Sequence, residues 1–516
     1  MIGSFWAFTP AIVAIILALV TKQVYVSLFT GIFVGAMMYA NGNPLAALQA
    51  LFEVMSDKVG GNATIIVFLV VLGILVILMQ KSGGAKAYGD WAGKKIKSKR
   101  GALTATAGLG CLIFVDDYFN CLTVGSTMRP VTDKFKVSRS KLAYIIDSTA
   151  APICIIAPIS SWAAAVSDNF DNGILAFVKA IPFNVYALLT IAFVFVLCFF
   201  KMDFGKMKKN EMLAEKTGDL NGGEGDESTD EADIAANPRG KVHHLIVPVA
   251  VLIVCCIGAM LYTGDFPNVS IIKAFSDCSA GMSLAMGSTV ALVIISIYYM
   301  ATRVVSFKEI TDSFTHGFKA MVPAILILTF AWTLSGIMGA GVTPGDVLDG
   351  TNPYLYVNYF VENTLSDMSF ISSVMPAIFF ILACGIAFAT GTSWGTFSIL
   401  LPIGIELVSA SGEALIMMTV AATLGGAVFG DHVSPISDTT ILSSAGANCN
   451  HVDHVKTQMP YAVLIAAIAF LSYLAAGFAT SLGGLVSCLI MWAIALTLFV
   501  GAFFLIKYLN RRAENN

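Results

Sequence analysis

The chain has 516 residues, of which 57% are apolar and only 12% are charged, and its mean hydropathy is +0.80. This composition is typical of a membrane protein with many spans and excludes an ordinary soluble enzyme. The net charge of −3 says little, because in a membrane protein the placement of Lys and Arg carries the information, and no nucleic-acid partner is expected.

Apolar runs of spanning length recur along the chain and predict an all-α polytopic membrane protein with about eleven transmembrane helices. They lie near residues 6–21, 24–40, 63–80, 142–166, 182–200, 244–263, 282–301, 320–341, 414–445, 460–480 and 485–506. A hydrophilic segment at 203–242, with an acidic, Gly-rich run from Glu224 to Asp233, divides them into two halves. We expect this segment to be a solvated cytoplasmic linker, and the lipid bilayer to surround the apolar runs.

Basic residues orient the predicted helices, since cytoplasmic loops carry an excess of Lys and Arg. Such residues crowd 81–100, 129–141 and the tail from Lys507 to Arg512. The C-terminus is therefore expected in the cytoplasm and the N-terminus outside.

Two further apolar stretches are predicted to enter the membrane and return to the same side. Residues 101–130 start and end at basic loops, with Asp116 and Asp117 near the turn. Residues 371–408 turn at Gly391 and follow an outside loop that is marked by acidic residues. These are Asp346, Asp349, Glu362 and Asp367. Both stretches are therefore predicted to be re-entrant hairpins.

The order of elements repeats with opposite orientation in the two halves. Each half has three spanning helices, a hairpin, a helix broken by Gly or Pro, and another helix, and the halves start from opposite sides of the membrane. The predicted units are a first inverted repeat at 1–202 (hairpin about 101–130, broken helix about 142–166), the linker at 203–242, a second inverted repeat at 243–481 (hairpin about 371–408, broken helix about 414–445), and an extra helix with a cytoplasmic tail at 482–516. Interrupted segments at matching places of inverted halves indicate a transporter with its binding site at the midplane.

Six carboxylates lie in segments otherwise fit only for a membrane, where a charged side chain costs about 2.5 to 3.5 kcal/mol. They are Asp116, Asp117, Asp147, Glu406, Asp431 and Asp438. Four of them cluster in two stretches broken by Gly or Pro, 115–118 and 430–438, where unwound backbone and oxygen side chains can coordinate a sodium-sized cation. The candidate ion or substrate ligands are Asp116, Asp117, Asn120, Ser148, Thr149, Ser160, Ser161, Thr392, Ser393, Thr396, Asp431, Ser434, Ser437, Asp438 and Thr439. The sequence thus predicts a carrier of small ions.

Three motifs around these residues resemble those of NhaC-type sodium/proton antiporters, members of the ion-transporter superfamily. They are Phe114 to Asn120 (FVDDYFN), Gly391 to Thr396 (GTSWGT) and Gly425 to Thr440 (GGAVFGDHVSPISDTT). The likeness runs over nearly the whole membrane portion. It implies a secondary active transporter of the plasma (inner) membrane, a homodimer with an elevator mechanism, that exports Na+ in exchange for H+ without cofactor or enzymatic activity. It leaves open an exchanger of small organic acids of the malate or lactate type, or of amino acids, coupled to Na+ or H+.

Antiport follows if one carboxylate binds either Na+ or H+ but not both. Burial favours the protonated carboxyl and a bound cation favours the ionised one, so a desolvated aspartate can exchange the two. Asp116 and Asp117 form a like-charge pair, but adjacent helical residues point about 100° apart, so only one is expected to face the pathway. We favour Asp117 and Asp431 as exchangers, with Na+ held through these two and Asp438, and His432 as a pH sensor.

Structural roles are the alternatives for the same residues. Asp431 or Asp438 would instead cap a half-helix, and the Ser and Thr hydroxyls would bond to carbonyls of their own helices. Asp147 and Glu406 are expected at membrane edges or in structural hydrogen bonds, and the alternative for His432 is a packed polar side chain.

One further group resembles a metal cluster in composition. It consists of Cys449, His451, Asp453 and His454. Because the group falls in a predicted cytoplasmic loop, we expect solvated side chains there and no metal.

Other functional classes fit less well. Phe429-Gly430-Asp431 resembles the Gly-x-Gly-Asp element of intramembrane aspartyl proteases, but position 428 is Val where that motif has Gly. A passive channel would show a ring of repeated filter residues, and none stands out. An organic-anion exchanger needs a counter-charge, for which Arg129 is the nearby candidate unless bound Na+ or helix N-termini replace it.

Overall fold

The computed structural model describes residues 4–21, 23–167, 169–170, 173–200, 202–223, 237–339, 354–356, 360, 369–435 and 437–515. Every regular element within these residues is a helix. The main helices are α1 (Thr9–Thr21), α2 (Val24–Tyr39), α3 (Pro44–Gly61), α4 (Ala63–Lys81), α5 (Gly84–Lys95), α6 (Lys99–Leu112), α7 (Asp117–Lys134), α8 (Arg139–Cys154), α9 (Ser161–Ser167), α10 (Gly173–Ala180), α11 (Val185–Phe200), α12 (Gly205–Thr217), α13 (His243–Thr263), α14 (Ile271–Asp277), α15 (Ala280–Ala301), α16 (Phe307–Met338), α18 (Ser369–Thr390), α19 (Ser393–Leu407), α20 (Glu413–Val433), α21 (Asp438–Ala447), α22 (His451–Phe478) and α23 (Gly484–Asn515). The remaining elements are short 3₁₀ turns.

Nine of the described helices are long and apolar enough to cross a membrane, and up to ten if the bent pair α2 and α3 forms one span. The sequence-based count of about eleven is close to this number. The difference arises because some apolar runs are not continuous helices: α8 ends at Cys154, and α1 has only 13 residues. The chain is a helical multi-pass membrane protein.

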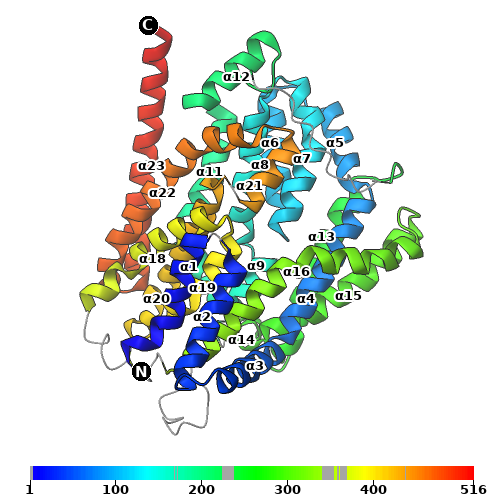
Figure 1. Ribbon diagram of the computed structural model, residues 1–516. Coiled ribbons are helices and arrows are strands. Elements are labelled where there is room, and N and C mark those ends of the chain that lie inside the picture. Colours follow the sequence, from blue (N-terminus) through cyan, green and yellow to red (C-terminus); the bar gives the residue numbers. More distant parts are fainter. Residues whose placement is uncertain are drawn as a thin grey trace.

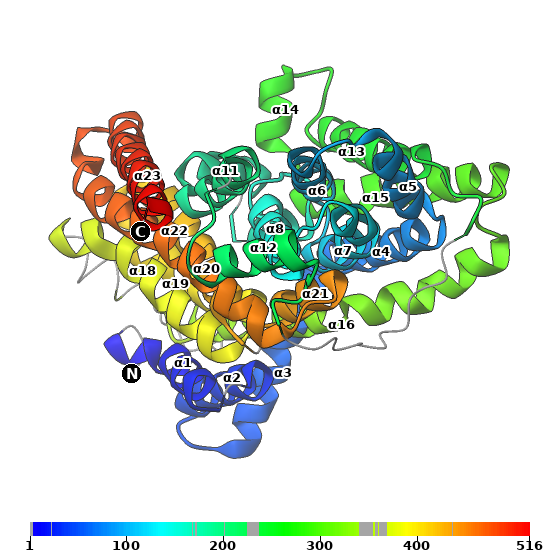
Figure 2. The same cartoon turned by 90° about the horizontal axis from the view of Figure 1, so that it is seen from above.

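The helices form a bundle with two peripheral groups. In Figure 2, α1, α2 and α3 lie along one edge, α23 lies at another, and α8, α20 and α21 lie near the centre. The long helix α16 packs against α2, α3 and α4. Figure 1 shows the N-terminus at one end of the molecule, and α12 with the C-terminal end of α23 at the other.

Four interruptions of helices shape the centre of the bundle. Residues 113–116 separate α6 from α7, and 391–392 separate α18 from α19. A second pair of breaks, at 155–160 and 434–437, separates α8 from α9 and α20 from α21. These breaks fall inside the predicted hairpins and broken helices, and the arrangement of the halves as inverted repeats stays a prediction.

Helices α7 and α21 touch through their backbones. A Cβ atom added at Gly125 would lie 2.6 Å from the Cα of Gly446, closer than two such atoms can approach. Glycine at these positions therefore lets the second arm of the first hairpin pack directly on the second half of the second broken helix.

The expectation of a solvated linker is wrong for its first part. Helix α12 is ordered, and Met207 and Ala214 are buried on it. The carboxylate of Asp203 forms a 2.5 Å ion pair with Lys141 of α8, in which both side chains are largely buried. Apolar residues spaced along one face of α12 thus dock this segment on the bundle, while the acidic run at 224–236 lies outside the described residues. The predicted outside loop with Asp346, Asp349, Glu362 and Asp367 also lies outside them.

Candidate ion-binding site

The turn of the first hairpin separates the roles of its two aspartates. The Oδ1 of Asp116 accepts a 2.9 Å hydrogen bond from the backbone N–H of Phe119 and caps α7, and the Ser161 hydroxyl lies 3.4 Å from its Oδ2. Asp117, fully buried, accepts a 3.2 Å bond from the indole N–H of Trp162 on Oδ2. Its Oδ1 has no hydrogen-bond partner among the described residues. Asp116 thus stabilises the turn by capping α7, whereas the Oδ1 of Asp117 is available to bind a proton or a cation.

Asn120 closes the same turn from inside. Its amide nitrogen lies 2.7 Å from the carbonyl oxygen of Gly110, 2.8 Å from that of Ile113 and 3.2 Å from that of Thr149. The last turn of a helix leaves carbonyl groups without partners, and burial makes each of them costly. Asn120 satisfies two such groups at the end of α6 and links them to α8. Its buried Oδ1 has no hydrogen-bond partner among the described residues, so Asn120 stays a predicted ion ligand.

The second hairpin turns at Gly391, whose φ of +70° suits glycine. Thr392 caps α19 by accepting a bond from the N–H of Gly395. The next residue, Ser393, donates a 3.1 Å hydrogen bond to Oδ2 of Asp431. The turn thereby places the hydroxyl of Ser393 in contact with Asp431 at the end of α20.

Asp431 is the meeting point of the second hairpin and the second broken helix. Besides Ser393, the hydroxyl of Thr439 on α21 donates a 2.9 Å bond to its Oδ2. The carboxylate is 1% exposed, and its Oδ1 has no partner among the described residues. Asp431 does not cap a helix, because Ser437 fills that position at the start of α21.

The two hairpin turns and the two breaks meet at one place. The N–H of Asp438 lies 3.4 Å from the carbonyl of Gly391, and the hydroxyl of Tyr118, beside Asp117, donates a 3.4 Å bond to the carboxylate of Asp438. Asp117 lies within electrostatic range of Asp431 as well as of Asp116. Buried carboxylates this close are stable only when protons or cations neutralise part of their charge.

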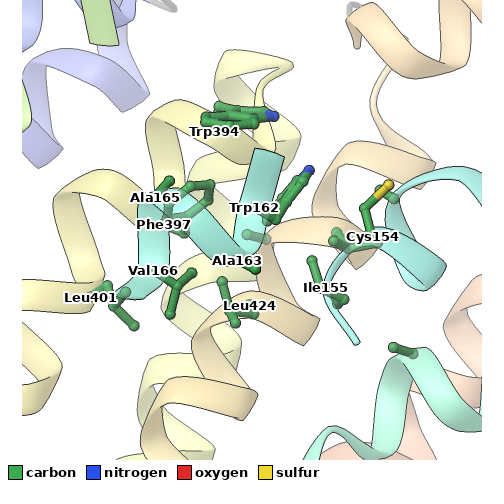
Figure 3. Packing of buried hydrophobic residues seen from close by; sticks show 14 of the residues in the cluster. Cys154, Ile155, Trp162, Ala163, Ala165, Val166, Trp394, Phe397, Leu401 and Leu424 are labelled. Atoms are coloured by element: carbon green, nitrogen blue, oxygen red, sulfur yellow. The ribbon is translucent and has the colours of Figure 1, made fainter. Parts of the chain in front are cut away.

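An aromatic cluster borders this carboxylate group. The ring centroids of Trp162 and Trp394 lie 5.4 Å apart, and Phe397 lies 4.8 Å from Trp162 and 5.4 Å from Trp394. Figure 3 shows the three rings on α9 and α19. Because Trp162 also bonds to Asp117, the cluster forms an apolar wall directly behind an ionisable group.

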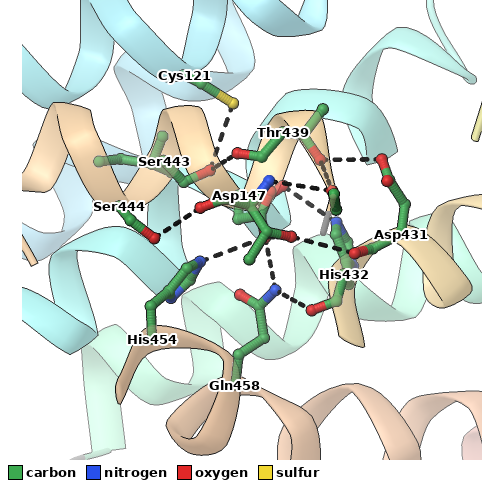
Figure 4. Close-up of polar contacts among 12 residues, drawn as sticks. Cys121, Asp147, Asp431, His432, Thr439, Ser443, Ser444, His454 and Gln458 are labelled. Carbon is green, nitrogen blue, oxygen red and sulfur yellow. Dashed lines mark hydrogen bonds and ion pairs between the residues drawn. The ribbon is translucent and has the colours of Figure 1, made fainter. Parts of the chain in front are cut away.

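A second buried network lies beside the first and centres on Asp147 of α8 (Figure 4). Its Oδ2 accepts a 2.5 Å hydrogen bond from the amide of Gln458 and lies 3.4 Å from Nε2 of His454 and from the hydroxyl of Thr440. The backbone oxygen of Asp147 lies 3.2 Å from Nε2 of His432. Thr440 also donates a bond to the backbone oxygen of Asp431, so the two networks share the helix break at 434–437.

Of the two alternatives for Asp147, a membrane edge or structural hydrogen bonds, the structure agrees with the second, because the side chain is fully buried and hydrogen-bonded. One expectation needs correction here. His454 and Asp453 were expected in a solvated loop, yet both are buried because α22 already begins at His451. The signal for this network was the spacing of His454 and Gln458, which places both side chains on one face of a helix.

His432 is buried and bonded on both sides. Its Nδ1 lies 2.9 Å from the hydroxyl of Tyr186, and its Nε2 faces the Asp147 carbonyl. This environment fits a packed polar side chain, and the assignment of a pH sensor stays a prediction.

Most of the predicted hydroxyl ligands bond to nearby backbone. Thr149 and Thr396 donate to carbonyls four residues earlier, and Ser160 donates to the carbonyls of Cys154 and Ala157 at the end of α8. Ser434 donates to the carbonyl of Phe388. Ser148 pairs with the side chain of Tyr144. These residues shape the helices and their breaks, whereas Ser393 and Thr439 reach the carboxylate of Asp431 and Ser161 reaches that of Asp116.

Among the described residues, no three or more His, Cys, Asp or Glu side chains are grouped so that they could hold a metal ion. Asp117, Asp431 and Asp438 therefore do not form a cage of carboxylates. Asp438 also differs from the other two because it is exposed.

Comparison with known proteins places these features in a family. The model of the "Na+/H+ antiporter family" matches residues 162–478. An uncharacterized protein of Haemophilus influenzae is 39% identical over 503 residues, covering 93% of this chain and 92% of that protein. The malate-2H(+)/Na(+)-lactate antiporter of Bacillus subtilis is 30% identical over 34% of each chain. The arginine/ornithine antiporter ArcD of Halobacterium salinarum is 29% identical over 33% of this chain and 39% of its own length.

The family match covers the second hairpin, both halves of the second broken helix and the Asp147 partners on α22. It begins at Trp162, the residue that contacts Asp117. Since it spans more than half of the chain, and one relative matches nearly all of it, the chain is a membrane transporter that belongs to the NhaC-type Na+/H+ antiporter family.

Proposed function

We propose that this transporter exchanges Na+ for H+ at Asp117 and Asp431. The observation that carries the proposal is a shared arrangement of two buried aspartates from different parts of the chain. Each has one carboxylate oxygen bonded to neutral donors, and each has a second oxygen without a partner among the described residues. A buried oxygen of this kind is a place for either a proton or a cation.

Competition between the two ions gives antiport. With Na+ bound, the carboxylates are ionised and the hydroxyls of Ser393 and Thr439 supply further oxygens close by. With Na+ gone, protons neutralise the same carboxylates and remove their mutual repulsion. Raising the pH therefore strengthens Na+ binding, because it removes the competing proton.

The Na+ ligands extend beyond carboxylates in this proposal. A hard cation takes carbonyl, hydroxyl and carboxylate oxygens together. The turn at 113–116 offers backbone carbonyls next to Asp117, and the hydroxyls of Ser393 and Thr439 lie at the Asp431 carboxylate. The exposed Asp438, bonded to Tyr118, is suited to the first contact of an arriving cation. Asp116 is left to its capping role.

A second candidate function is exchange of a small organic acid or amino acid coupled to Na+ or H+. The names of two relatives favour it, since one is a malate and lactate antiporter and the other an arginine and ornithine antiporter. Each of these relatives matches only about a third of the present chain, so the candidate ranks below cation exchange.

Location and movement belong to the same proposal. The basic groups Lys206 to Lys209 and Lys507 to Arg512 lie on α12 and at the end of α23, at the same end of the molecule (Figure 1). We place this end in the cytoplasm and the N-terminus outside a bacterial-type inner membrane. A homodimer with elevator movement rests on the family resemblance.

The test is a transport assay with purified protein in lipid vesicles that contain a trapped pH-sensitive dye. A pH gradient is imposed, and Na+, Li+, K+, malate and lactate are added one at a time. We expect Na+ alone to dissipate the gradient. A gradient that responds only when an organic acid is present would contradict Na+/H+ exchange and would favour the second candidate.

A further inference from the structure

A cavity of about 510 Å³ lies between helices α3, α9, α16 and α19. Such a volume is far larger than a bare cation needs and falls within the range of small-molecule sites, about 300–1,000 Å³. The lining residues include Lys58 of α3, Ala165 of α9, Trp332 of α16, and Phe397, Ser398 and Glu406 of α19. None of the candidate Na+ ligands lines it.

The cavity has opposite charges on different walls. Lys58 comes from the C-terminal end of α3, and Glu406 comes from α19. The stem of Lys58 packs closely on Gly336 of α16. The carboxylate of Asp57, which also lines the cavity, lies 4.0 Å from this ammonium group and its side chain is 68% exposed, so the pair satisfies the ammonium only weakly.

Ser398 points to a ligand independently of these charges. A serine inside a helix usually donates to the carbonyl four residues earlier, as Ser443 and Ser444 do in α21. Ser398 is only 6% exposed, yet its hydroxyl has no hydrogen-bond partner among the described residues. It lines the cavity, where a ligand oxygen or N–H could satisfy it.

The remaining walls are apolar and aromatic. Trp332 and Leu328 of α16 line the cavity together with Phe397, Pro402 and Ile405 of α19. Phe397 belongs to the aromatic cluster with Trp162, which bonds to Asp117. The cavity is therefore separated from the carboxylate group by a layer of aromatic rings.

We propose that this cavity binds a small zwitterionic amino acid with an apolar side chain, its carboxylate at Lys58, its ammonium group at Glu406 and a hydrogen bond to Ser398. A dicarboxylate fits less well, because its second negative charge would meet Glu406. A simple cation fits less well, because Lys58 would repel it. The proposal does not depend on Na+/H+ exchange, since the two sites use different residues.

The test is direct binding to purified protein in detergent, with L-leucine as the probe. Two analogues remove one charge each: 4-methylpentanoate lacks the ammonium group, and isoamylamine lacks the carboxylate. We expect leucine to bind and both analogues to bind about 30-fold more weakly or worse, as is usual when one partner of a charge pair is lost.

Variants test the two ends of the ligand separately. Lys58→Met is expected to weaken leucine binding while leaving isoamylamine binding unchanged. Glu406→Gln is expected to weaken leucine binding while leaving 4-methylpentanoate binding unchanged. The control is Lys179→Met, which removes an exposed lysine of α10 that pairs with Glu413 outside the cavity. Equal thermal unfolding temperatures of the variants show that folding is intact.

Two outcomes would overturn the proposal: no binding of leucine, or binding of 4-methylpentanoate as tight as that of leucine. Asp431→Asn keeps the outcomes for the two sites distinguishable. If Asp431→Asn loses Na+/H+ exchange and still binds leucine, both proposals are supported. If the wild-type protein exchanges Na+ for H+ without binding leucine, the cavity proposal alone fails.

Discussion

Replacement of Asp431 by Asn tests the exchange site with little change of shape. Asn keeps an oxygen that can accept the hydroxyl bonds of Ser393 and Thr439, now 3.1 and 2.9 Å from Oδ2. A hydrogen bond to a neutral acceptor is weaker than one to a carboxylate by about 1 kcal/mol. Removal of a buried charge offsets this loss, so the folded protein should lose about 2 kcal/mol of stability at most.

The effect on ion binding is larger. A unit charge 4 Å from a cation contributes about 4 kcal/mol at an effective dielectric constant of 20. Loss of this term weakens Na+ binding by about 1,000-fold. Asn also cannot take up the exchanged proton, so both half-reactions fail at the same residue.

The assay is dissipation of an imposed pH gradient by Na+ in vesicles, measured for wild type, Asp431→Asn and the control Asp312→Asn, which changes an exposed aspartate of α16. We expect no Na+ response from Asp431→Asn at any concentration that saturates the wild type, and an unchanged response from Asp312→Asn. If correctly folded Asp431→Asn kept half of the wild-type rate, Asp431 would not be an exchanging carboxylate.

The remaining predictions concern the framework of the site, and thermal unfolding in detergent measures each. Asn120→Leu should cost about 3 kcal/mol or more, because the two buried carbonyl groups at the end of α6 lose their donor. Lys141→Met should cost about 3–5 kcal/mol by leaving Asp203 buried and unpaired, and the double variant with Asp203→Leu should recover most of it. Gly125→Ala should destabilise the protein and reduce transport, since its Cβ would overlap the backbone of Gly446.

Each of these predictions has a matched control. Asn268→Leu changes an exposed asparagine and should leave the unfolding temperature nearly unchanged. Gly258→Ala in α13 places a methyl group in open space and should stabilise the helix by up to about 1 kcal/mol. A double variant of Lys141 and Asp203 no more stable than Lys141→Met would show that the unpaired charge is not the cause of the loss.

The helices and their breaks were largely predictable, because local chemistry decides them. Gly391 and the Asp116-Asp117 pair interrupt apolar runs, and the structure ends helices at both places. The importance of Asp431 could also be predicted, since an aspartate in an apolar run four residues before a Pro needs polar partners. Interruption is a property of neighbouring residues, and a single sequence displays it directly.

The partners of these residues were not predictable in the same way. Gln458 bonds to Asp147 across 311 residues of chain, and no local pattern joins the two. Trp162 was overlooked because an indole in an apolar segment is normally a packing residue. The error at His454 came from treating a stretch with several polar residues as a loop, although α22 starts there and buries them.

The close contact of Gly125 with Gly446 has a consequence for how the protein moves. The hairpin arm that follows Asp117 and the half-helix that follows Asp431 touch without side chains between them at this point. We expect a displacement of one to shift the other, so that ion binding at Asp117 and at Asp431 is coupled.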